Sequence, residues 1–151
     1  MKIGIIVYSQ TGHTLLVANE LKKSLESKNK VDILEIKANR NNGIELTNIP
    51  KIDDYDSLVL ATFTEAFSLC PVMREYLKQT SSLKSKKLAL FVTEHFPYPW
   101  MGGNHSIRQM KDLCKLKGGI TSVTGVINWS NKKRNLMISN LINKFTNYFN
   151  S

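Results

Sequence analysis

The chain has few cysteines and no long hydrophobic run, and both shortages exclude classes of protein. Two cysteines in 151 residues, Cys70 and Cys114, are too few for a disulfide scaffold and are interpreted as free thiols of a reducing compartment. No apolar run approaches the ~20 residues of a membrane span. The apolar start, Ile3–Tyr8, is short and leads into polar residues rather than a cleavage site for a signal peptide. We therefore expect a cytoplasmic protein with no membrane segment.

Acidic residues are scarce in the second half of the chain. The sequence has 21 Lys and Arg against 12 Asp and Glu, which gives a formal net charge of +9. Residues 1–75 hold nine basic and ten acidic side chains, whereas residues 76–151 hold twelve and two. Such a field would suit nucleic acid or an acidic partner, but the basic residues lack the interleaved aromatics of a nucleic-acid surface. A solvated lysine-rich surface explains the charge equally well.

Strand and helix patterns alternate along the whole chain. Strands are predicted over residues 3–8, 31–36, 57–63, 87–93 and 120–127, and helices over 13–28, after Pro71, around 107–114 and from near Ser130 onward. Residues 38–56 are polar and the least readable, and a short helix is conceivable there. The alternation predicts a parallel sheet with helices on both faces, in a single domain spanning residues 1–151.

Ligands of open parallel sheets bind beyond the carboxyl ends of the strands, which directs attention to the loops 9–14, 62–70 and 93–105. The first loop reads SQTGHT and leads into a helix, whose free backbone N–H groups attract anions. Ser9, Thr11 and Thr14 add hydroxyl groups, and Gly12 allows close approach of the backbone. Because the loop has no Lys or Arg, it suits a monophosphate held by dipoles better than a triphosphate. An ordinary capped helix start is the alternative.

The segment Tyr8–Thr14 resembles the FMN phosphate loop of the flavodoxin family. The usual pattern there is Ser/Thr-x-Thr-Gly-Asn-Thr, and His13 stands where Asn is usual. The resemblance implies an α/β flavodoxin-like three-layer sandwich with a five-stranded parallel sheet of order 2-1-3-4-5. It also implies one non-covalent FMN at the first and third strands of that sheet.

The resemblance further implies that the second and third loops border the flavin ring. The third loop contains Phe96, Tyr98 and Trp100, and such aromatic side chains stack well on a flat heteroaromatic ring. Core packing of the phenylalanines, a hydrophobic lid or a dimer patch are the alternatives. The candidate cofactor-binding residues are Ser9, Gln10, Thr11, Gly12, His13, Thr14, Thr62, Phe63, Thr64, Glu65, Ala66, Phe67, Thr93, Glu94, Phe96, Tyr98, Trp100 and Gly103. We assign no metal site and no catalytic acid or base.

The expected function is electron transfer through FMN, with a redox protein or a small electron acceptor as partner and a homodimer left open. A small NAD(P)H- or quinone-linked oxidoreductase is one alternative, and a basic binding protein of the same fold that has lost flavin is another. Residues 62–67 contain no glycine, and a positive φ would be costly at Thr64, Glu65 or Phe67. A peptide flip in this loop, which would stabilise the one-electron reduced flavin, is then costly. Two-electron chemistry is therefore favoured. Cys70, before Pro71, is a conceivable reactive thiol at a helix start.

Overall fold

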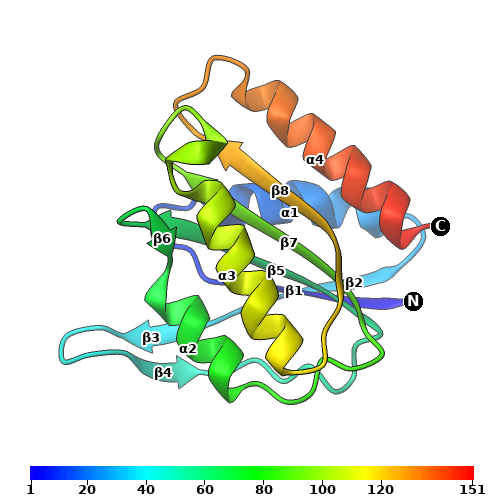
Figure 1. The fold of residues 1–151 in the computed structure, drawn as a ribbon. Coiled ribbons are helices and arrows are strands. Elements are labelled where there is room, and N and C mark those ends of the chain that lie inside the picture. Colours follow the sequence, from blue (N-terminus) through cyan, green and yellow to red (C-terminus); the bar gives the residue numbers. More distant parts are fainter.

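The computed structural model describes all 151 residues and contains a five-stranded parallel sheet of order β2-β1-β5-β7-β8 (Figure 1). The strands are β1 (Lys2–Val7), β2 (Lys30–Glu35), β5 (Ser57–Glu65), β7 (Lys87–Glu94) and β8 (Thr121–Asn128). Counted along the chain, this is the expected order 2-1-3-4-5. The chain reverses direction across the sheet between β1 and β5, and the carboxyl ends of these strands therefore define the ligand edge.

Helices cover both faces of the sheet and complete three layers. The helices α1 (His13–Leu25) and α4 (Arg134–Phe149) pack on one face, and α2 (Pro71–Gln79) and α3 (Gly103–Leu116) on the other, where α3 crosses in front of the strands in Figure 1. Alternate residues of each inner strand enter opposite cores: in β5, Val59 packs toward α1 and α4, and Leu60 toward α2 and α3. Burial on both faces explains the continuous apolar runs of the sequence.

Residues 38–56 contain no helix, so the short helix that the sequence left open there does not form. An antiparallel pair, β3 (Lys37–Asn39) and β4 (Glu45–Asn48), projects from the lower left of Figure 1. Gly43 has a positive φ of 86° in the connection, as tight reversals require. The strands are short and largely exposed, so they carry almost no apolar alternation from which a strand could be predicted.

Two helix boundaries differ from the predicted ones. Helix α1 ends at Leu25 and not at residue 28, and the Leu25 carbonyl accepts from both the backbone N–H and the side-chain amide of Asn29, at 3.1 and 3.0 Å. Ser130 Oγ donates to the His95 carbonyl at 2.6 Å, and Asn131 Nδ2 to the Pro97 carbonyl at 2.8 Å. These bonds tie residues 130–131 to the third loop and delay the start of α4 to Arg134. No helix has both the length and the apolar character needed to cross a bilayer.

Candidate functional site

A cavity of about 170 Å³ opens at the carboxyl ends of β1, β5 and β7. Its lining residues come from the three loops that sequence analysis selected, and they are Gln10, Thr11, His13, Phe63, Thr64, Thr93, Glu94 and His95. All except His95 were among the candidate cofactor-binding residues. The cavity therefore joins the first loop, the end of β5 and the end of β7 in one place.

The first loop presents unpaired backbone donors beside this cavity. Gly12 has a φ of 89° and its N–H donates to Ser9 Oγ at 3.2 Å, which closes the loop just before α1. The N–H groups of His13, Thr14 and Leu15 donate to no group of the chain. Thr14 is buried, and its hydroxyl lies 2.9 Å from that of Thr93. Thr14 thus ties the loop to β7, while the free N–H groups are available to an anion.

Positive charge reaches the first loop from the start of α4. The His13 ring stacks on Trp129 with centroids 3.9 Å apart and an interplanar angle of 10°. The Arg134 guanidinium lies 4.7 Å from the centroid of the Trp129 ring, and its Nη1 donates to the Trp129 carbonyl at 2.8 Å. Burial, then the charges of Arg134 and His95, lower the pKa of His13. The site is therefore electropositive although its loop contains no Lys or Arg.

Glu94 is a buried carboxyl group in the cavity wall. Only 3% of the residue is exposed; the Asn128 amide donates to Oε1, and Oε2 has no partner. Burial raises the pKa of Glu94. A Cβ on Gly103 would lie 2.5 Å from Val126 Cγ1 and 3.1 Å from the Glu94 carboxyl. Gly103 therefore allows α3 to begin against Glu94.

The second loop is a two-residue hairpin held by side chains from two other parts of the chain. β5 extends to Glu65 and pairs with the short antiparallel strand β6 (Ser68–Leu69). The Arg40 guanidinium, beyond β3, binds the Glu65 carboxylate through two bonds of 2.7 and 2.6 Å, and this hydrogen bonding lowers the pKa of Glu65. The side-chain carbonyl oxygen of Gln109, in α3, accepts from Ser68 Oγ and from the Leu69 N–H. The Glu65 charge is therefore neutralised by a residue that sequence analysis did not select.

The two turn residues of this hairpin both adopt positive φ, contrary to the expectation for residues 62–67. Ala66 has a φ of 49° and Phe67 of 64°. The type I′ turn, one of the two that usually close a two-residue hairpin, requires positive φ at both central positions, and strand pairing here overrides the preference of the side chains. Gly102 of the third loop approaches so closely that a Cβ on it would lie 2.8 Å from the Phe67 Cα. Earlier in this segment, Thr62 is buried and donates to the Tyr8 carbonyl at 3.1 Å.

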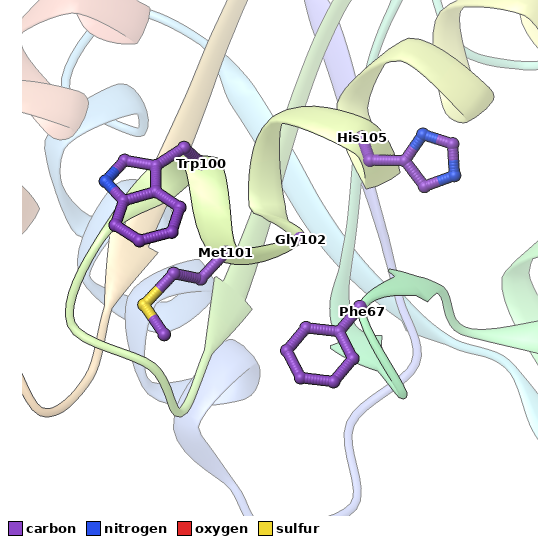
Figure 2. A pocket seen from close by; sticks show the side chains of 5 residues that line it. All are labelled: Phe67, Trp100, Met101, Gly102 and His105. Carbon is purple, nitrogen blue, oxygen red and sulfur yellow. The ribbon is translucent and has the colours of Figure 1, made fainter.

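The aromatic residues of the second and third loops are divided among different surfaces. Phe63 lines the cavity, whereas Phe67 stacks on Phe96 with centroids 4.9 Å apart and nearly parallel rings. Figure 2 shows a separate depression of about 310 Å³ lined by Phe67, Trp100, Met101, Gly102 and His105. Tyr98 stacks on Trp100 at 6.0 Å, and both side chains are exposed, Trp100 by 73%. Contact of Tyr98 and Trp100 with a cofactor stays a prediction.

Comparisons with known proteins identify the architecture. No protein-family model matches the sequence, and no curated protein matches it. Solved structures do match over nearly the whole chain. A flavodoxin from the domain Archaea has a TM-score of 0.70 at 14% identity, with 100% of both chains covered. Flavodoxin 2 from Bacillus cereus has a TM-score of 0.67 at 18% identity, covering 98% of this chain and 99% of its own. A Fusobacterium nucleatum flavodoxin, described as bound to flavin mononucleotide, has a TM-score of 0.66 at 15% identity and covers 97% and 98%.

The fold is that of a flavodoxin. On this flavodoxin fold, the residues that sequence analysis missed are His95, Trp129, Arg134 and Arg40. The first three reach the first loop through the connections that follow β7 and β8, and the fourth comes from the β3–β4 pair. The run Lys132-Lys133-Arg134 after a predicted strand was the one available signal, because that junction also lies at the carboxyl edge of the sheet.

Cys70 does not have the surroundings of a reactive thiol on this flavodoxin fold. It occupies the N-cap position of α2, and Pro71 takes the first helical position as expected. Cys70 is fully buried, and burial raises the pKa of its thiol although the nearby N–H groups of Val72 and Met73 oppose this shift. Desolvation thus outweighs the helix terminus, and the thiolate is disfavoured.

Proposed function

We propose that the chain binds one FMN non-covalently at this cavity and transfers electrons through it. The observation that carries the proposal is the set of free N–H groups at the start of α1, which open beside the cavity formed by the ends of β1, β5 and β7. A Fusobacterium nucleatum flavodoxin of the same fold is described as bound to flavin mononucleotide, which supports this choice of ligand.

The residues at the first loop fit a phosphate group. Three unpaired N–H groups at a helix start supply donors, and the exposed Thr11 hydroxyl adds another. Arg134 adds positive charge, while the Glu94 carboxyl is kept from ionising readily by burial. The loop therefore accepts an anion without a desolvated counter-charge opposing it.

The ring requires space that the cavity does not supply by itself. Pockets that enclose a whole cofactor usually measure about 300 Å³ or more, so a cavity of about 170 Å³ accommodates the phosphate and the sugar-alcohol chain. The Phe67–Phe96 stack fills the gap between the second and third loops. The Phe63 ring in the cavity wall and the Phe67–Phe96 pair are the aromatic surfaces on which the ring would pack.

FMN supplies the redox chemistry when bound, and the chain supplies binding, orientation and charge. Thr14 and Thr93 hold the first loop against β7, and the Arg40–Glu65 pair holds the second loop. Glu94 has a free oxygen in the cavity wall and can hold a proton there. No other acid lines the cavity.

The colour of the purified protein tests the proposal. We expect a yellow protein whose released pigment is FMN, or an apoprotein that quenches flavin fluorescence when titrated with FMN. Phosphate-free riboflavin is the matched ligand and should bind more weakly, since it cannot use the N–H groups of α1. A colourless protein that binds neither compound would refute the proposal and favour a basic binding protein of the same fold.

A small quinone- or NAD(P)H-linked oxidoreductase is the second candidate, and the depression in Figure 2 favours it. Its walls are apolar except for His105, and its 310 Å³ would accept a flat aromatic electron acceptor. The FMN-loaded protein should then oxidise NADH or NADPH with a soluble benzoquinone as acceptor. Trp100→Ala should raise the KM for the quinone while FMN remains bound. A pure electron carrier would show neither turnover nor this dependence.

A further inference from the structure

His13 faces the candidate phosphate site without an ionised partner. Its ring lines the cavity and is held in place by stacking on Trp129. It belongs to the first turn of α1, where a neutral imidazole is favoured by the positive end of the helix. The flavodoxin pattern usually has Asn at this position, and an Asn cannot change its charge.

The charged groups around His13 come from three elements and are mostly positive. Arg134 contributes from the start of α4, and His95 from the segment after β7. Glu94, at the end of β7, is the only carboxyl group in the cavity wall, and its burial disfavours the charged form. Burial, Arg134 and His95 lower the pKa of His13 and so favour the neutral imidazole in the ligand-free protein.

We propose that His13 takes up a proton when a phosphate monoester binds at the start of α1, so that FMN affinity rises as the pH falls. This inference rests on the proposed function for the identity of the ligand. A phosphate dianion adds an attraction that opposes the repulsion from Arg134 and His95, and the proton is therefore bound more tightly in the complex. Stacking on Trp129 keeps the ring directed at the cavity and stabilises its protonated form.

Linkage sets the sign and the limit of the effect. Because the pKa of His13 is higher in the complex than in the free protein, affinity rises as the pH falls through the higher value. It levels off once the pH is below the lower value, since His13 is then protonated in both states. One proton can change the dissociation constant by at most about tenfold per pH unit.

Calorimetric titration with FMN at several pH values tests the proposal. In the unaltered protein we expect the dissociation constant to fall about threefold or more from about pH 8 to about pH 6.5, with net proton uptake seen as a dependence of the heat on buffer ionisation. His13→Asn should abolish the uptake and give a flat or slightly opposite dependence, because the phosphate itself gains a proton near pH ~6. Riboflavin should show no dependence with either protein.

Two variants and one further ligand make the result decisive. His105→Asn makes the same change outside the cavity, in the depression of Figure 2, and should retain the full pH dependence. Glu94→Gln should retain it as well. If Glu94→Gln abolishes the uptake while His13→Asn keeps it, Glu94 is the responsive group and the proposal is wrong.

Inorganic phosphate separates this inference from the proposed function. If neither the unaltered protein nor its variants bind FMN, the proposed function fails. The His13 ring can still be titrated by NMR with and without inorganic phosphate. A higher pKa of His13 in phosphate would support the proton-linked site without flavin. An unchanged pKa would overturn it.

Discussion

The left-handed turn at Ala66 and Phe67 leads to a prediction of unusual sign: Ala66→Gly should stabilise the protein. Ala66 has a φ of 49°. A residue with a Cβ in this region is less stable by roughly 1–2 kcal/mol, whereas glycine adopts it freely. Glycine also loses more backbone freedom on folding, at a cost of about 0.5–1 kcal/mol. The difference favours the variant by about 0.5–1 kcal/mol.

Thermal and chemical unfolding measure this difference. For a chain of 151 residues, a change of about 0.5–1 kcal/mol corresponds to a rise in Tm of about 1–4 °C. Ala38→Gly is the matched control, because Ala38 lies in β3, pairs with Leu46 of β4 and does not have a positive φ. It should destabilise the protein by about 0.5–1 kcal/mol. If Ala66→Gly is as destabilising as this control, the turn is not left-handed and the described hairpin is wrong.

Three further changes probe the site. Gly103→Ala should destabilise by about 1–3 kcal/mol in urea unfolding, since its Cβ would lie 2.5 Å from Val126 Cγ1; an unchanged midpoint would contradict that packing. Arg40→Gln should cost about 1 kcal/mol at pH 7. Because Arg40 lowers the pKa of Glu65 below 4.5, this contribution is present above that value and disappears as the pH falls through the folded-state pKa, so unfolding curves of the two proteins should converge in acid. Thr11→Ala should weaken FMN about ten- to a hundredfold, from a loss of roughly 1.5–3 kcal/mol, and leave riboflavin binding unaffected; equal loss with both ligands would place the phosphate elsewhere.

Local patterns in the sequence determined the layered sheet and the place of the candidate site. The runs 3–8, 57–63 and 87–93 predict strands buried on both faces, because every residue of such a strand meets a core. The strand–loop–helix pattern around Ser9–Thr14 then places the first loop at the carboxyl end of β1. The strands and this loop depend on residues that are close together in the sequence. They can therefore be predicted from a single sequence.

The remaining features of the site depend on residues far apart in the sequence. His13 meets Trp129 and Arg134 only because β8 and α4 return to the edge where α1 begins. The turn at Ala66 and Phe67 has positive φ because pairing of β5 with β6 requires it, and this requirement overrides local preference. In the same way, the Arg40–Glu65 pair forms because the connection that follows β3 meets the end of β5. Contacts between such distant residues leave no periodic pattern or fixed spacing in the sequence. Only the tertiary structure therefore decided them.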